Sequence, residues 1–96
     1  MTVTVPADHP CLAGHFPGRP VVPAVLLLEL AAAALRERLG PLRINGAPGA
    51  KFLLPVLPEQ PLLLTLSADP ARGRAGFRCE SGGSLAAHGE LSFDRP

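Results

Sequence analysis

The segment from residue 24 to residue 39 constrains the fold of this 96-residue chain more than any other stretch. With one exception, its residues are apolar in every direction around a helix until Arg36, and a helix without a polar face is buried on all sides. Pro23 suits a helix start, because a proline lacks only an N–H that would have no intrahelical partner there. Gly40 and Pro41 form a typical helix stop. The sequence therefore predicts a buried central helix over Ala24–Leu39.

The exception is Glu29, a carboxylate in the most apolar part of the predicted helix. An isolated ionised carboxylate in such surroundings is very unfavourable, so it must find a partner, reach a wet cavity or stay protonated. A carboxylic acid that is neutral near pH 7 can donate a proton. The plainer alternative is that Glu29 reaches solvent through a gap in the packing. We favour a functional role, because perturbed carboxylates concentrate at functional sites.

His15 lies in a turn rich in glycine and proline, fourteen positions before Glu29. Alone, a histidine in such a turn is as readily a surface residue as a catalyst, since its ordinary pKa merely makes it available near neutrality. Together with an acid it has a clearer meaning. A base and an acid are the two partners that removal of a proton and a hydroxyl group requires. We therefore expect His15 and Glu29 to form a catalytic pair.

The motif around this pair resembles a known family. The run Gly-His-Phe-Pro-Gly-x-Pro-x-x-Pro-x-Val over residues 14–25, followed by Glu29, resembles the hotdog-fold 3-hydroxyacyl-(acyl-carrier-protein) dehydratases of fatty-acid synthesis and their shorter relatives in polyene pigment pathways. Residues 5–13 and 49–58 resemble the strand before the motif and the long strand after it. The resemblance implies an α+β hotdog fold, in which an antiparallel sheet wraps one buried helix, as a single domain over residues 1–96.

The resemblance also implies roles for individual residues. His15 would take the proton from C2 of the acyl thioester, and Glu29 would protonate the departing 3-hydroxyl, the two residues coming from different subunits of a dimer. The backbone N–H near Ala24 or Val25 would polarise the thioester carbonyl. Helix N-termini favour charge on an oxygen for physical reasons as well. The expected substrate-binding residues are Phe16, Gly18, Pro23, Ala24 and Val25, although the family usually has glycine where Ala24 stands.

The implied substrate is a (3R)-3-hydroxyacyl chain on the phosphopantetheine arm of acyl carrier protein, and the product is the trans-2-enoyl thioester. Neither a metal nor a cofactor is implied. Two other functions stay open. Ala24 and the short stretch before the motif also suit a weakly catalytic or non-catalytic acyl-binding subunit that pairs with a longer homologue. A thioesterase on the same fold is the other alternative, because fold alone does not fix function.

A metal site near the motif is a weaker alternative. His9, Cys11 and His15 are residue types that suit zinc, but their spacing matches no common structural zinc pattern. Cys11 and Cys79 lie far apart, so a disulfide framework is not expected and a reducing cytoplasm fits best. We expect no bound metal.

Composition limits the partners. Hydrophobic residues make up 47% of a small chain, and a homodimer or higher oligomer is the simplest way to bury them. A net charge of +1 and the absence of Tyr and Trp give no reason to expect nucleic acid. The longest apolar run is too short to span a membrane, and no secretory signal is evident. The arginines around the motif and the helix end, which are Arg19, Arg36, Arg38 and Arg43, form either an ordinary solvated surface or one that steers an acidic carrier protein.

The remaining sequence predicts an antiparallel sheet. Residues 42–48 suggest a loop or an irregular strand with a bulge, and Ser81-Gly82-Gly83 indicates a tight hairpin. Gly89 is expected to let its strand approach the helix closely. The expected strands are Thr2–Val5, Ala50–Val56 with Phe52, Leu54 and Val56 on one face, Leu62–Ala68, Arg74–Glu80 with Ala75, Phe77 and Cys79 inward, and Ser84–Phe93 with Leu85, Ala87, Gly89, Leu91 and Phe93 on one face.

Overall fold

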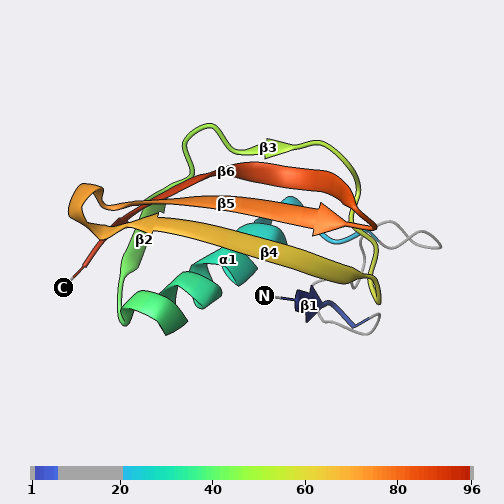
Figure 1. Ribbon diagram of the computed structural model, residues 1–96, viewed down its shortest axis with the longest axis horizontal. Helices are drawn as coiled ribbons and strands as arrows, with labels where there is room; N and C mark the ends of the chain where they lie inside the picture. The colour runs from blue at the N-terminus through green and yellow to red at the C-terminus, as the bar shows by residue number, and fades with distance from the viewer. Residues whose placement is uncertain (1, 7–20, 96) are drawn as a thin grey trace.

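The computed structural model describes residues 2–6 and 21–95. One helix, α1 (Ala24–Leu39), lies against one face of a curled antiparallel sheet (Figure 1). The strands follow the order β1-β4-β5-β6-β2, and β3 also pairs with β6. This confirms the predicted α+β arrangement. The strands are β1 (Thr2–Thr4), β2 (Arg43–Gly46), β3 (Lys51–Phe52), β4 (Pro61–Asp69), β5 (Arg74–Ser81) and β6 (Ser84–Asp94), and a 3₁₀ helix (Pro70–Arg72) joins β4 to β5.

The helix begins and ends where the sequence predicts. Pro23 has an extended backbone (φ −62°, ψ 145°) directly before the first helical residue. At the other end, Gly40 has a φ of 85°, a conformation that glycine adopts without a steric penalty. Its N–H donates to the carbonyl of Arg36 at 2.8 Å and so satisfies one of the last helical acceptors.

Only one side of α1 is buried, so the prediction of a helix buried on all sides is wrong for the single chain. The helix packs against β4 and β5, which cover one of its faces. Val25, Glu29 and Ala33, spaced four residues apart and therefore on one stripe, are exposed on the other side. A sheet of this size covers one helix face and leaves the other uncovered. The buried residues of α1 are Leu26, Leu27, Ala31, Ala32 and Leu35.

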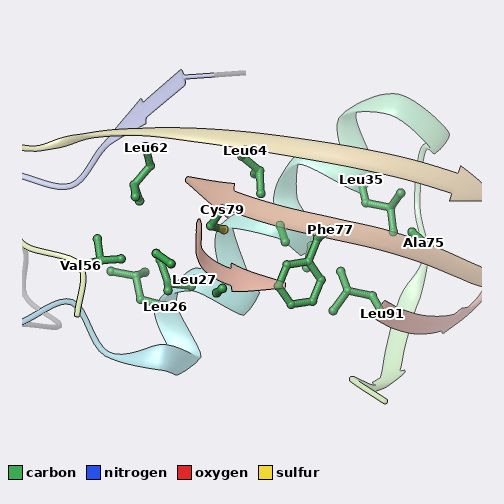
Figure 2. Close-up of a cluster of buried hydrophobic side chains, with 14 of the residues drawn as sticks. Leu26, Leu27, Leu35, Val56, Leu62, Leu64, Ala75, Phe77, Cys79 and Leu91 are labelled. Carbon is green, nitrogen blue, oxygen red and sulfur yellow. The ribbon is translucent and has the colours of Figure 1, made fainter. Parts of the chain in front are cut away.

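The long strands supply the other half of the core. Leu62 and Leu64 of β4 alternate with exposed residues, as predicted for a strand with one buried face. Ala75, Phe77 and Cys79 do the same on β5 and, as Figure 2 shows, gather with the leucines of α1. The hairpin between β5 and β6 turns at Gly82 and Gly83, whose φ angles are 60° and 81°. Such a pair of positive φ angles fits a tight two-residue turn, so the hairpin prediction is confirmed.

Strand β6 departs from simple alternation near its start. The pairing with β5 shifts between Cys79 and Glu80, and as a result Ala86 and Ala87 are both fully buried while Leu85 is only half-buried. A bulge of this kind places one extra residue in a strand. The expectation for Leu85 is therefore wrong, whereas those for Ala87, Leu91 and Phe93 are confirmed.

Gly89 is required for a close approach, but the neighbouring segment is not the helix. A Cβ placed on Gly89 would lie 2.6 Å from the Cα of Ala50. The residues around Ala50 connect β2 to β3, and the N–H of Glu90 donates to the carbonyl of Pro48 at 3.3 Å. The prediction of a close approach is thus right in kind and wrong about the partner.

The segment after β3 differs most from expectation. The predicted strand over Ala50–Val56 shortens to the two residues of β3, because the N–H groups of Leu53 and Leu54 both turn to the carbonyl of Ala86, at 2.7 and 3.3 Å. Pro55 then has no N–H to continue a ladder. Val56 is buried as predicted, but Phe52 and Leu54 are exposed. Of the two alternatives left open for residues 42–48, a loop or an irregular strand with a bulge, the structure has the irregular strand, β2, whose register shifts between Ile44 and Gly46.

Candidate functional site

The predicted site residues fall into two groups. His15, Phe16 and Gly18 lie outside the described residues. Pro23, Ala24, Val25 and Glu29 are described, and they follow one another along the first two turns of α1. The site can therefore be built from its helical half.

The start of α1 carries backbone donors without an acceptor inside the helix. The N–H groups of Leu26 and Leu27 both point back to the carbonyl of Pro23, at 3.0 and 3.4 Å. The N–H groups of Ala24 and Val25 precede the first intrahelical acceptor, and both residues are exposed. Because the helix dipole is positive at this end, these N–H groups favour an oxygen that carries negative charge.

An apolar groove lies beside these donors. Its volume is about 300 Å³, and every described side chain that lines it is apolar. A hydrogen bond of 2.7 Å from the N–H of Val22 to the carbonyl of Val56 holds its two walls together. A groove with apolar walls and a few backbone donors at one end suits a ligand with an apolar body and a polar group. The lining residues are Val21, Val22, Ala24, Leu27, Phe52, Leu53, Leu54, Pro55 and Val56.

Glu29 lies one helical turn after Val25 and on the same face. Its side chain is exposed and makes no hydrogen bond or ion pair with the described residues. Within one chain, Glu29 therefore does not have the buried, apolar environment that the sequence predicts. Its neighbours on the stripe, Val25 and Ala33, are nevertheless apolar. Among the described residues, Glu29 is thus a carboxylate without a partner in an exposed apolar stripe.

The surface around the helix start is unusually apolar. Val25 and four residues of the 52–57 segment are between 42% and 57% exposed. We call these five residues, Val25, Phe52, Leu53, Leu54 and Leu57, the apolar patch. Leu63 on β4 is the other large hydrophobic residue exposed in the described part of the chain. Contiguous exposed apolar surface commonly marks a site of association.

Other candidate chemistry finds no support in the described residues. Burial raises the pKa of the Cys79 thiol, so this side chain stays protonated and serves as core packing rather than as a nucleophile. His9, Cys11 and His15, the residues of the weaker alternative of a zinc site, lie outside the described residues. Within residues 2–6 and 21–95, no three histidine, cysteine or acidic side chains gather to hold a metal. None of the described helices is long and apolar enough to cross a membrane.

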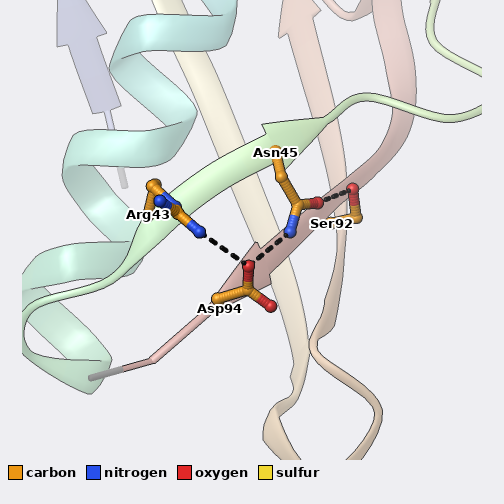
Figure 3. A network of polar contacts seen from close by, with 4 residues as sticks. All are labelled: Arg43, Asn45, Ser92 and Asp94. Atoms are coloured by element: carbon orange, nitrogen blue, oxygen red, sulfur yellow. Dashed lines mark hydrogen bonds and ion pairs between the residues drawn. The ribbon is translucent and has the colours of Figure 1, made fainter.

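The predicted arginine cluster lies at the opposite end of α1 from the groove. Arg36 donates to the carbonyl of Leu42 and Arg38 to the carbonyl of Leu66, each at 3.3 Å. Arg43 forms an ion pair with Asp94, which also accepts a hydrogen bond from Asn45 (Figure 3). Arg19 lies outside the described residues. The three described arginines of the cluster therefore all make contacts within the chain.

One further arginine was missed by sequence reasoning. Arg95 donates to the carbonyl of Leu39 at 3.0 Å and so satisfies the last residue of α1. Nothing in the local sequence indicates this contact, because 56 positions separate the two residues. A cation near the C-terminus of a helix is stabilising on general grounds.

Comparison with known proteins identifies the family. Residues 1–90 match the ApeI-like family model, which describes ApeI dehydratase. The 3-hydroxyacyl-(acyl-carrier-protein) dehydratase FabZ of Chlamydia trachomatis is 38% identical over an alignment of 104 positions, gaps included, that spans 93% of this chain and 67% of that protein. The protein of the same name from Chloroflexus aggregans is 36% identical over an alignment of 100 positions, which spans 93% of this chain and 69% of that protein.

The solved structures agree on the fold. A chain of the dehydratase heterocomplex ApeI:P from Xenorhabdus doucetiae superposes with a TM-score of 0.89 at 23% identity, over 98% of this chain and 84% of that one. An uncharacterized protein from Erwinia carotovora superposes with a TM-score of 0.86 at 22% identity, over 97% of this chain and 79% of that one. The helix against a curled antiparallel sheet is thus a hotdog fold, and the chain belongs to the ApeI-like family of dehydratases.

Proposed function

We propose that this protein removes water from (3R)-3-hydroxyacyl thioesters carried on acyl carrier protein and releases trans-2-enoyl thioesters. One observation carries the proposal: Glu29 lies one turn from a helix start with two backbone donors that lack an intrahelical acceptor, beside a groove with only apolar side chains. The names of the FabZ relatives supply the substrate class, at 36–38% identity.

The proposed reaction needs one base, one acid and one oxyanion site. The imidazole of His15 takes the proton from C2, and the electron pair of that C–H bond forms the C2–C3 double bond. The C3–O bond breaks, and its oxygen takes a proton from the carboxylic acid of Glu29 and departs as water. The N–H of Ala24 or Val25 stabilises negative charge on the thioester oxygen. Ala24 supplies the same N–H as the glycine that is usual in the family.

The apolar groove accounts for the rest of the substrate. We assign the acyl chain to the walls around residues 52–56, because burying methylene groups there yields about 0.8 kcal/mol each. The thioester would then lie at the helix start, with C3 near Glu29 one turn further on. Pro23 fixes the entry to the helix, and Phe16 and Gly18 are proposed to complete the wall.

A second copy of the chain is proposed to complete the site. Each protomer contributes one hotdog domain over residues 1–96, and the partner covers the apolar patch and the exposed stripe around Glu29. That cover removes water from around the carboxyl group and from the reacting part of the substrate. In this arrangement His15 comes from the partner protomer. We place the reaction in the cytoplasm, as the cysteine usage predicts.

The test uses a panel of (3R)-3-hydroxyacyl carrier proteins, with intact-protein mass spectrometry recording the loss of one water. Glu29→Gln keeps the size of the side chain but removes the acid, and His15→Ala removes the base. Each is expected to lower kcat by about 10²- to 10⁴-fold, the usual contribution of a general acid or base. Glu37→Gln is the matched control, since Glu37 is an exposed carboxylate on the same helix. Normal turnover by both site variants would overturn the proposal.

The same assay separates the alternatives. A thioesterase would release the thiol of the carrier and a free acid instead of an alkene. An acyl-binding subunit would give no product until a second protein is added. Static light scattering on every variant shows whether a loss of activity comes with a loss of the dimer.

A further inference from the structure

The outer face of the sheet, which points away from α1, carries a row of basic side chains. Lys51 of β3 pairs with His88 of β6, and His88 pairs with Arg78 of β5. Arg78 in turn pairs with Thr65 of β4. Residues directly opposite one another in antiparallel strands project from the same face. Arg78 alternates with the buried Phe77, so the face of this row is the one opposite to the helix.

This row lacks the charge complementarity found elsewhere in the sheet. Arg43 pairs with Asp94 directly across β2 and β6, and Arg74 lies 3.7 Å from Glu90. Lys51, His88 and Arg78 instead follow one another across three strands with no carboxylate between them. The nearby carboxylates are engaged elsewhere or lie at the limit of an ion pair. Glu90 is engaged by Arg74, and Glu80 lies 4.0 Å from Arg78 in a half-exposed pair.

Among the described residues, the side chains of two members of the row have no polar partner. The side chains of Lys51 and His88 make no hydrogen bond and no ion pair there, although His88 is half-buried. Their ammonium and imidazole groups are therefore available as donors. An oxyanion between them and Arg78 would occupy these donors.

A hollow lies directly beside the row. Its volume is about 250 Å³, and hydroxyl groups of Thr65 and Ser67 border it. Gly76 opens it, because this position on the outer face of β5 has no side chain. A Cβ at Gly76 would touch Ser67 and Gly89 only at 3.9–4.0 Å, so a methyl group could project from Gly76 beside the hollow without moving the backbone. The other lining residues are Phe77, Arg78, His88 and Gly89.

We propose that this hollow and row bind a phosphate group, either as inorganic phosphate or as a small phosphate monoester. The guanidinium of Arg78 offers paired N–H donors that match phosphate oxygens. Lys51 and His88 supply further donors from the neighbouring strands, and Thr65 and Ser67 supply hydroxyl groups. Because the site lies on the opposite sheet face from α1 and Glu29, it goes beyond the proposed dehydratase function.

Titration of the whole protein tests the site. Isothermal calorimetry and NMR would follow inorganic phosphate in one arm and glycerol 3-phosphate in the other. Saturable binding is expected, with NMR shifts at His88, Arg78 and Gly76. Tighter binding of glycerol 3-phosphate would point to a phosphate monoester, and equal binding to the inorganic ion. Shifts that rise linearly without saturation in both arms would overturn the proposal.

Two variants and a control make the result specific. Arg78→Ala removes the strongest donor, and Gly76→Ala places a methyl group at the position that opens the hollow; each is expected to weaken binding at least tenfold. Arg72→Ala is the control, because Arg72 is an exposed arginine whose ion pair with Asp69 lies outside the row. Thermal unfolding confirms that the variants fold. Unchanged affinity in both folded variants would contradict the site, whatever the dehydratase assay shows.

Discussion

The two ends of α1 are finished in different ways. At the C-terminal end, the N–H of Gly40 donates to the carbonyl of Arg36, and Arg95 donates to the carbonyl of Leu39. At the N-terminal end, the N–H groups of Ala24 and Val25 have no acceptor within the helix, and Ala24 lines the groove together with three residues of the apolar patch. The C-terminal end therefore has its backbone groups bonded within a single chain, and we call it the closed end. The N-terminal end, which we call the open end, is where we propose that the substrate and the partner protomer bind.

The first prediction is that the C-terminal half of α1, at the closed end, contributes more to the free energy of unfolding than the N-terminal end does. Leu35 is fully buried in the C-terminal half of α1. Leu35→Ala is expected to lower the free energy of unfolding by about 2–5 kcal/mol, through lost burial and the cavity left behind. Urea unfolding followed by circular dichroism measures it. Val25→Ala at the open end serves as the control and is expected to cost far less. Equal losses would show that the two ends do not differ in this way.

The second prediction concerns the apolar patch. Leu54→Asp places a charge in the surface that we propose a second protomer covers, so it is expected to turn a dimer into a folded monomer and to abolish dehydration. Leu63→Asp is the matched control, because Leu63 is 45% exposed against 47% for Leu54 but belongs to β4 and not to the patch. Static light scattering and the dehydration assay give the readouts. A Leu54→Asp protein that stays dimeric would move the interface elsewhere.

Local signals in the sequence predicted the helix and the hairpin. Pro23 and Gly40 fix the ends of α1 through their own backbone preferences, and Gly82 and Gly83 supply the positive φ angles of the turn. Such effects act within a few residues, so they can be read without the fold. The alternation along β4 and β5 was equally visible, since one face of each strand packs on the helix.

Features that depend on distant segments were not visible. Strand β3 is short because the bulge in β6 places the carbonyl of Ala86 opposite Leu53 and Leu54. No local sequence pattern predicts this pairing. The exposure of Glu29 depends on how far the sheet reaches around the helix. The prediction of a fully buried helix took account of its composition and not of the area available to cover it.

The third prediction tests the contact between Gly89 and the segment before β3. Gly89→Ala would bring a methyl group within 2.6 Å of the Cα of Ala50, so the backbone must shift. The expected loss is about 1–3 kcal/mol, as for overpacking in a tight interior. Thermal and urea unfolding measure it. Gly76→Ala is the control, because its Cβ has room and no such loss is expected. An unchanged free energy of unfolding in Gly89→Ala would mean that the segment around Ala50 can move aside without a cost in stability.

The smallest effect is expected at the polar network of the closed end. Asp94 accepts hydrogen bonds from Arg43 at 3.4 Å and from Asn45 at 3.0 Å, and the side chain of Asn45 in turn accepts one from Ser92 at 2.6 Å (Figure 3). The Arg43 and Asp94 side chains are 82% and 61% exposed, so solvent and salt screen their attraction. Asp94→Ala is therefore expected to cost no more than about 1 kcal/mol, and high salt should reduce that cost further.

Urea unfolding of the Asp94→Ala protein at low and high salt decides this point. A small, salt-sensitive loss would mean that the closed end is held chiefly by the carbonyl contacts of Arg36 and Arg95 and by the buried residues beneath them. A large loss that salt does not change would instead give the network a structural role in holding β2 on β6. In that case the polar network around Asp94, and not only the hydrogen bonds at the end of α1, would make the closed end more stable than the open end.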